Sequence, residues 1–434
     1  MVIWLDWITI IISTIFLLKS YRNIVINTRY IVYLLFFLFY VLPLYLDCFF
    51  SPPIYTDWLG QGFTPSSTDF ETRAIYDVLI ILIQLFILNY KKNQIINKTG
   101  IYRYQEDLNS GTTIALYLGM IIPVLLTAIS SSHKFILYTL QWREVFDASL
   151  VARYTYFEKM SYIGVACSLI LLFAKKRKHP VFINICCIAF LYSCICIEGK
   201  RSIIFFAFLL ILLIKIPGIA DNSVPVEKRR RILFRLLLLG VVVVTLMVTL
   251  TIMVKVGSRG YDARNINELY TTTRIDFFRD DRVRLAIYSI IHSNVSSILE
   301  YPGQTLINIP LYFFPVDYVL NMHHVTISTY SMYLTSALLG NLHKAVMTPA
   351  IFAELVSNLG IIGFVIMPII CVWFSQKSDK FSYPQNVFIL TSFVLLQMYD
   401  FAYVAYFIEF TIIICWMNRI RVKGKHVYIQ LRRK

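Results

Sequence analysis

Charged residues are scarce in this sequence. Asp, Glu, Lys and Arg together make up 15% of the 434 residues, whereas hydrophobic residues make up 58%. A soluble globular domain carries about 25% charged and about 45–50% apolar residues. The chain therefore has too few polar side chains to cover its apolar surface in water. This excludes a water-soluble enzyme and a disordered protein, and it favours a location in a lipid bilayer.

The motifs of several other protein classes are also missing. The eight cysteines lie almost entirely within apolar runs and lack the spacing with histidine that is typical of a metal site. The sequence has no phosphate-binding loop, no nucleotide-sugar signature and no internal repeat. The net charge of +16 would suit nucleic acid only if it were not confined to one side of a membrane. We expect no metal, no cofactor and no nucleic-acid partner.

Long apolar runs predict an all-α polytopic integral membrane protein. About twenty apolar residues are needed to cross the hydrocarbon core of roughly 30 Å. On this measure about eleven transmembrane helices are predicted, near residues 2–18, 30–50, 74–90, 113–129, 160–174, 181–197, 202–216, 233–256, 350–374, 386–399 and 401–417. The first run is not expected to be a cleavable signal peptide, because it lacks a basic N-terminal region and a small-residue cleavage site.

The positions of lysine and arginine predict the orientation. Most of the 41 basic residues lie in one set of alternate loops and in the C-terminal tail, and loops of that kind are cytoplasmic. The N-terminus is therefore predicted outside and the C-terminus in the cytoplasm, with membrane lipids as partners. Four regions follow: eight transmembrane helices in 1–256, an external loop with short helices in 257–349, three helices in 350–417, and a basic tail in 418–434.

The external loop 257–349 contains many arginines and little lysine. Arginine binds phosphate oxygens through two parallel hydrogen bonds and stays charged when partly desolvated, so this bias suits a membrane-anchored diphosphate. The predicted ligands of the diphosphate are Arg259, Arg274, Arg279 and Arg282 of the loop, with Lys200 and Arg201 in a short outside turn. The alternative remains open that the loop arginines pair with the aspartates interleaved among them, such as Asp280 and Asp281.

Two residues are candidates for handling the proton of a reacting hydroxyl. Glu354 lies at the outer start of the run 350–374, and a carboxylate near the hydrocarbon edge is a functional candidate. His324 is one of four histidines in the external loop, with His292, His323 and His343, and a neutral imidazole can act as a general base. Each of these residues could also have a purely structural role, as an arginine-paired carboxylate or a surface histidine.

These features resemble the Wzy-type polymerases of lipid-linked oligosaccharide repeat units, which make O-antigen and capsule. The resemblance rests on the many spans, the large late external loop, the turn Gly199-Lys200-Arg201 before a span, and a Glu-x-x-x-Asn-x-Gly-x-x-Gly stretch. That stretch comprises Glu354, Asn358, Gly360 and Gly363. The resemblance implies a GT-C-like fold in the bacterial inner membrane, with a periplasmic N-terminus and no need for a metal or nucleotide sugar. It implies undecaprenyl-diphosphate-linked oligosaccharides as substrates, and it allows for a chain-length regulator and a flippase as partners.

Three other functions remain open. An O-antigen ligase has a similar plan and differs mainly in its acceptor. A transferase that uses a polyprenyl-phosphate sugar would show an acidic pair in the first outside loop, where Asp57, Asp69 and Glu71 occur without a sharp motif. A flippase or other transporter would have short loops and charged residues in mid-membrane, whereas here the polar residues are concentrated in one external loop. The sequence also shows no inverted pair of broken helices of the kind found in transporters.

Overall fold

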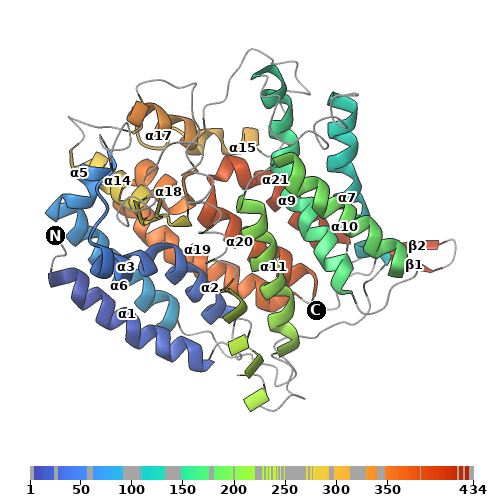
Figure 1. Cartoon of the computed structure of the whole chain (residues 1–434), viewed down its shortest axis with the longest axis horizontal. Coiled ribbons are helices and arrows are strands. Elements are labelled where there is room, and N and C mark those ends of the chain that lie inside the picture. Colours follow the sequence, from blue (N-terminus) through green and yellow to red (C-terminus); the bar gives the residue numbers. More distant parts are fainter. Residues whose placement is uncertain are drawn as a thin grey trace. The chain divides into compact units, whose positions relative to one another are not determined.

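The computed structural model is helical, with a small β-hairpin near the C-terminus (Figure 1). The residues that it describes are 4–23, 28–55, 62–90, 108, 110–131, 148–174, 180–198, 201–219, scattered positions within 227–249, 270–271, 274–275, 277–292, 298–312, 329–339, 348–381, 383–417, 420–423 and 426–429. The chain divides into two units. Unit 1 comprises Met1–Asn97, Val248–Lys377 and Phe393–Ala405, and unit 2 comprises Lys98–Met247, Ser378–Ser392 and Tyr406–Lys434.

Unit 1 contains the first helices of the chain and those of the predicted external segment. Its helices are α1 (Trp4–Asn23), α2 (Thr28–Phe36), the π-helical turn η1 (Phe37–Val41), α3 (Leu42–Phe50), α5 (Phe63–Thr68), α6 (Phe70–Asn89), α14 (Asp280–Ile291), the 3-10 turn η2 (Leu306–Asn308), α15 (Ile309–Tyr312), α17 (Tyr330–Leu339), α18 (Ile351–Leu359) and most of α19 (Ile361–Lys380). Parts of α20 (Gln385–Met398) and α21 (Phe401–Met417) belong to each unit.

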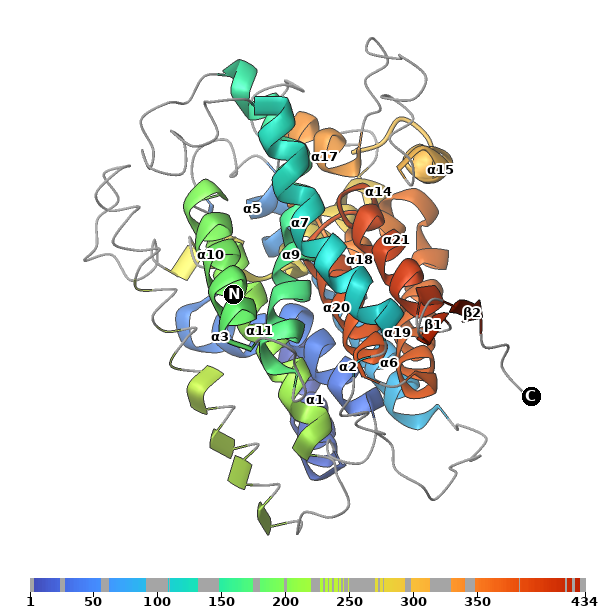
Figure 2. The same ribbon diagram turned by 90° about the vertical axis from the view of Figure 1, so that its right-hand side faces the viewer.

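Unit 2 is built around α9 (Ala148–Phe173). This helix lies against α7 (Ser110–Ser131), α10 (Pro180–Glu198) and α11 (Arg201–Ile219), as two perpendicular views show (Figures 1 and 2). Strands β1 (Ile420–Lys423) and β2 (His426–Ile429) pair antiparallel, with Arg421 opposite Tyr428. The predicted basic tail therefore contains a hairpin, which the sequence analysis did not predict.

The helical class predicted from the apolar runs is confirmed. Helices occur at all the predicted runs except 233–256, most of which lies outside the described residues. The run 350–374 is not one helix, because it is divided into α18 and α19 at Gly360. Among the described residues, two helical stretches are long and apolar enough to cross a membrane, Thr28–Phe50 and Ile361–Lys380, and several shorter apolar helices accompany them.

Successive helices at the start of unit 1 alternate in direction. Asp6 near the start of α1 contacts Arg73 near the start of α6, so these two helices begin at the same end. At the opposite end, Arg29 in the first turn of α2 donates a hydrogen bond of 2.6 Å to the carbonyl oxygen of Tyr90, which follows α6. The segment α2–α3 therefore runs against α1 and α6.

Candidate functional site

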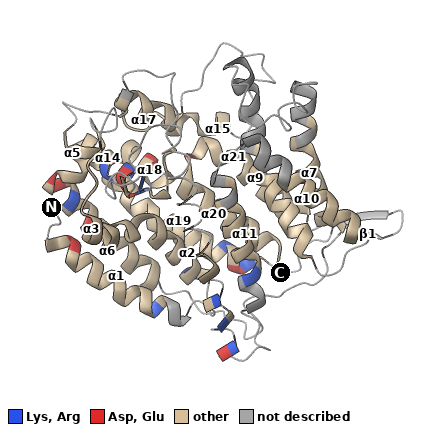
Figure 3. Cartoon of the chain, in the orientation of Figure 1, with Lys and Arg blue, Asp and Glu red and all other residues tan. Residues whose placement is uncertain are grey.

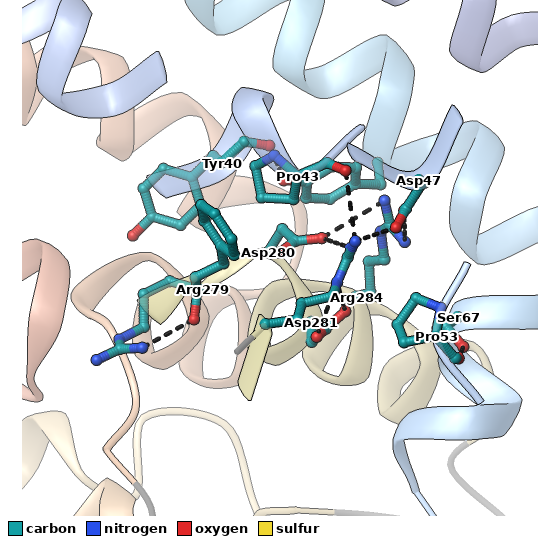
Figure 4. A network of polar contacts seen from close by, with 12 residues as sticks. Tyr40, Pro43, Asp47, Pro53, Ser67, Arg279, Asp280, Asp281 and Arg284 are labelled. Atoms are coloured by element: carbon teal, nitrogen blue, oxygen red, sulfur yellow. Dashed lines mark hydrogen bonds and ion pairs between the residues drawn. The ribbon is translucent and has the colours of Figure 1, made fainter. Parts of the chain in front are cut away.

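The predicted external segment is fastened to the long helices of unit 1 by a buried group of charges (Figure 4). We call it the Asp-Arg cluster. Its members come from α3, from the residues just before α14, and from α14 itself: Asp47, Arg274, Asp280, Asp281 and Arg284. All five side chains are almost completely buried. Figure 3 shows charged residues around α14 and at the helix ends near the N-terminus, while most of the length of the long helices carries none.

Arg274 is the centre of this cluster. Its Nη1 contacts Asp47, its Nη2 contacts Asp280, and its Nε donates to both oxygens of Asp281 at 3.2 Å. Tyr270 supports the arrangement, because its hydroxyl donates to Asp47 Oδ1 at 2.5 Å. The Arg274 guanidinium is fully buried and has carboxylates on three sides. It therefore holds the segment before α14 against α3.

Arg284 is bound less tightly in the same cluster. Its Nη1 lies 3.7 Å from Asp47 Oδ2 and its Nη2 lies 3.5 Å from Asp280 Oδ2, so both are ion pairs without a hydrogen bond. The guanidinium carbon is 5.0 Å from the centre of the Tyr76 ring, within the range of a cation–π contact. Arg284 therefore contributes charge to the cluster more than directional bonding.

The three carboxylates of the cluster outnumber its two guanidinium groups. Burial disfavours the excess negative charge, and it raises the pKa of Asp280 to about 7. Burial also acts on Asp281, but the neighbouring guanidinium groups of Arg274 and Arg284 and a hydrogen bond from Tyr55 outweigh it, so the pKa of Asp281 is lowered. One carboxyl of the cluster is thus poised to take up a proton near neutral pH.

Pro43 explains why the helix α2–η1–α3 can accept the external segment. Proline has no N–H to donate to the carbonyl four residues earlier, and its ring crowds that carbonyl. The helix widens here into the π turn η1, and the carbonyl oxygen of Phe39 instead accepts the backbone N–H of Arg279 at 3.2 Å. The next carbonyl, that of Tyr40, accepts the hydroxyl of Tyr76 at 2.7 Å. A local sequence feature thus provides acceptors for a distant segment.

A second buried group, centred on Glu354, fastens the turn before η2. Glu354 Oε1 accepts the hydroxyl of Thr305 at 3.0 Å, and Oε2 accepts the backbone N–H of Phe401 at 2.9 Å. Asn358 accepts the backbone N–H of Thr305 at 3.1 Å and donates to its hydroxyl at 2.8 Å. Asp400 caps α21 and also accepts the N–H of Ser331 at 3.1 Å. These contacts join the external turn to the starts of α18, α17 and α21.

The two glycines of the Glu-x-x-x-Asn-x-Gly-x-x-Gly stretch shape the break between α18 and α19. Gly360 has φ +56°, which side chains with a Cβ rarely adopt. At Gly363 a Cβ would lie 2.5 Å from the carbonyl oxygen of Leu355, so glycine allows the two helices to meet closely. The carbonyl oxygen of Asn358, left without a helical partner at the break, accepts the N–H of Gly303 at 3.0 Å. The stretch therefore forms a helix–break–helix that receives the external turn.

The geometry changes the roles predicted for three arginines. Arg274 is neutralised by three carboxylates of the chain, so the geometry gives no support to its predicted role as a diphosphate ligand. Arg279 donates to the carbonyl oxygens of Met398 and Phe278, and Figure 4 shows its side chain directed away from the labelled carboxylates. Arg282 donates to the carbonyl oxygens of Phe278 and Ile275. Both are buried, so they too hold the backbone of the segment rather than face an external phosphate.

The remaining predicted site residues have different outcomes. Glu354 is buried, and each of its two carboxylate oxygens accepts one hydrogen bond, so in the structure it positions the chain. Its predicted role in handling a proton stays a prediction. Lys200, Arg259 and His324 lie outside the described residues, and of Arg201 the structure describes only the backbone, as the first residue of α11. Their predicted roles stay predictions.

A group of buried charges on the first helices was not predicted from the sequence: Asp6, Asp47, Arg73 and Asp77. A signal for three of them was present, because Asp6, Asp47 and Asp77 each interrupt a predicted apolar run. A charged residue in such a run is expected to be functional or paired. The partners could not be read from sequence, since Asp47 and Arg274 are more than two hundred residues apart.

Among the described residues, no three His, Cys, Asp or Glu side chains are grouped so that they could hold a metal ion. Comparison of the chain with models of protein families, with curated proteins and with solved structures finds no match.

Proposed function

We propose that the chain is a polytopic integral membrane protein. The observation that carries this proposal is the distribution of residues around α1, which is the reverse of that in a soluble protein. Its exposed face carries large apolar side chains: Trp4, Trp7, Ile8, Ile11, Ile15 and Leu18. Its buried face carries polar ones: Asp6, Thr9, Ser13 and Ser20. An exposed apolar stripe around a polar interior suits lipid and not water.

Other helices have the same exposed apolar faces at helical spacing. On α6 the exposed residues are Val78, Leu82 and Phe86, and on α10 they are Val181, Phe182, Ile185 and Ile188. On α19 they are Ile361, Ile362, Val365, Ile369 and Trp373. These faces recur in both units, so they are not one docking surface for one partner. A surrounding hydrocarbon solvent accounts for all of them at once.

We further propose that the protein polymerises undecaprenyl-diphosphate-linked oligosaccharide repeat units at the outer face of the bacterial inner membrane. In this reaction the glycosidic bond from the growing glycan to its carrier diphosphate breaks, and a bond forms to a hydroxyl of the next unit. The hydroxyl loses a proton and the carrier leaves as the diphosphate. Cations are needed near the leaving diphosphate, and a base or an orienting group near the hydroxyl.

The structure supports this proposal through one of the two stretches that carry the resemblance. The Glu354–Asn358–Gly360–Gly363 stretch forms a break that receives the external turn, as a functional motif at a membrane surface would. In the revised assignment Lys200, Arg201 and Arg259 are proposed to bind the diphosphate. Glu354 and the buried arginines are positioning residues that fix the external segment over the membrane helices.

His292 is a second candidate, in addition to the predicted His324, to orient or deprotonate the acceptor hydroxyl, and it is one of the described residues. It follows the last residue of α14, is 35% exposed at its side chain, and has Nε2 3.7 Å from Asp69 Oδ2. Partial burial raises the pKa of Asp69, but hydrogen bonds from Thr72 outweigh it and lower that pKa. Asp69 is therefore ionised at neutral pH and can orient the imidazole.

The experiment that tests this function is deletion of the gene followed by electrophoresis of the surface glycan. We expect the ladder of long chains to disappear while single repeat units still reach the cell surface. The wild-type gene should restore the ladder, and an Arg201→Ala variant present at wild-type level should not. Loss of every unit from the surface would favour a ligase or a flippase instead, and an unchanged ladder would contradict the proposal.

A further inference from the structure

Two carboxyl groups face each other at the outer ends of α1 and α6. Asp6 of α1 is paired with Arg73, and Asp77 lies one helical turn beyond Arg73 on α6. All three side chains are at least 97% buried. Neither oxygen of Asp77 is reached by an N–H or O–H donor of the described residues, and the polar group within hydrogen-bonding reach is the carboxyl of Asp6.

Two ionised carboxylates cannot form a hydrogen bond with each other, because each has only acceptors. Their contact in a buried place is favourable only when a proton lies between them. Arg73 neutralises one of the two charges and leaves the other. A proton on the pair would balance the charge and supply the missing donor at the same time.

Besides Arg73, the described cation that acts on Asp77 is Arg284 of α14. The neighbouring charged or titratable groups are Asp47 and Cys48 of α3, Tyr76 and Arg73 of α6, and Arg284 and Asp280 of α14. Arg284 is already shared with Asp47 and Asp280. Across the connected group, carboxylates outnumber guanidinium groups. The carboxylates are those of Asp6, Asp47, Asp77, Asp280 and Asp281, and the guanidinium groups are those of Arg73, Arg274 and Arg284. The carboxylates remain in excess when Arg282, which lies near Asp281, is counted as well.

We propose that Asp6 and Asp77 form a proton-binding site that joins α1 to α6. The proton resides on Asp77 and is donated to Asp6, while Asp6 keeps its ion pair with Arg73. Loss of the proton would leave two like charges in contact without water and would push the outer ends of α1 and α6 apart. The proposal depends on the burial of these residues and not on the glycosyl-transfer reaction, so it can fail or succeed separately.

The roles of the two carboxyls predict an asymmetry between two conservative variants. The Asp77→Asn variant carries an amide that can donate to Asp6 as the protonated acid does, so it should fold with an unchanged thermal midpoint at neutral pH. The Asp6→Asn variant removes the partner of Arg73 and should lower the midpoint by several degrees. Glu71→Gln serves as the control, because Glu71 is an exposed carboxylate on the same helix.

Infrared spectroscopy of the purified full-length protein in lipid nanodiscs at pH 7 tests the proton directly. We expect the C=O stretch of a protonated carboxylic acid to lose the intensity of one group in Asp77→Asn and to remain unchanged in Glu71→Gln. Equal intensity in the wild type and Asp77→Asn, or equal destabilisation by Asp6→Asn and Asp77→Asn, would overturn the proposal. A saturable rise of the wild-type midpoint with Na⁺ but not K⁺, absent in Asp77→Asn, would also overturn it in favour of a sodium ion.

Discussion

The two units bury different kinds of side chains. In the described part of the chain, every buried Asp, Glu and Arg belongs to unit 1, where the Asp-Arg cluster, the Asp6–Asp77–Arg73 group and the Glu354 group occur. The interior of unit 2 is aromatic and aliphatic. Tyr162 and Phe206 meet edge to face at 4.9 Å between ring centres, and Phe388 and Phe407 lie 5.8 Å apart. The polar contacts in the described interior of unit 2 join uncharged groups. An example is the hydrogen bond between the hydroxyls of Ser392 and Thr411, whose oxygens lie 3.0 Å apart.

This difference indicates which unit carries the function. Buried charges are costly and add little net stability compared with apolar packing, so a protein that keeps them in one unit has another reason for them. In unit 1 they connect the predicted external segment to the long helices, and they lie beside the stretch that resembles the polymerase motif. Unit 2 has the interior expected of a supporting helical bundle.

The sharpest test of this contrast is removal of Arg274. We expect Arg274→Ala to destabilise the protein by about 3–5 kcal/mol, because three carboxylates would lose their shared cation in a buried place. The thermal midpoint of the purified protein in detergent measures this. An exposed arginine of unit 2 gives the matched control, and Arg235→Ala should change stability by less than about 0.5 kcal/mol. Equal effects of the two substitutions would remove the distinction between the units.

Glu354 gives a test of intermediate size. We expect Glu354→Gln to cost about 1–3 kcal/mol, because an amide has one acceptor oxygen and cannot accept from both Thr305 and the N–H of Phe401. The exposed Glu227 of unit 2 is the control, and Glu227→Gln should be neutral. If the Glu354 variant kept wild-type stability and lost only glycan polymerisation, Glu354 would be a catalytic residue and not a positioning one.

The pH dependence of stability gives a third test of the contrast. The pKa of Asp280 is about 7 in the folded protein, above the value of about 3.9 for an unperturbed aspartate. The folded protein therefore binds this proton more tightly than the unfolded chain does. The resulting stabilisation is fully present below the unfolded pKa and is lost as the pH rises through about 7.

Thermal midpoints measured between pH 5 and 9 would show this contribution. The midpoint of the wild type should fall between pH 5 and about 7 and level off above that, and the fall should be shallower in Asp280→Asn. Glu227→Gln in unit 2 should retain the wild-type slope. A slope in Asp280→Asn as steep as in the wild type would show that this carboxyl does not titrate there.

The sequence predicted the helices well and the charged groups poorly, for physical reasons. An apolar run of about twenty residues forms a helix whatever its neighbours are, and the helices appear where such runs occur. The break at Gly360 was missed because the run continues through it, and only the backbone conformation reveals it. The hairpin was missed although residues 420–423 alternate between apolar and polar side chains, the pattern of a strand.

The roles of the arginines could not be decided from sequence. Arg274 has the same local surroundings whether it faces phosphate or carboxylate, and interleaved aspartates permit both. Asp47, brought in from a distant helix, decides in favour of the carboxylates. Glu354 was correctly singled out as an unusual residue, but its two donors come from Thr305 and Phe401, about fifty residues away on either side.

Reconstitution of the purified protein is the most direct measurement of the proposed activity. The protein would be placed in lipid vesicles with undecaprenyl-diphosphate-linked repeat units and no nucleotide sugar, and the glycan products separated by length. The account predicts chains of two and more repeat units together with release of undecaprenyl diphosphate. Folded protein that leaves the units unjoined, in vesicles where a known polymerase joins its own units, would contradict it.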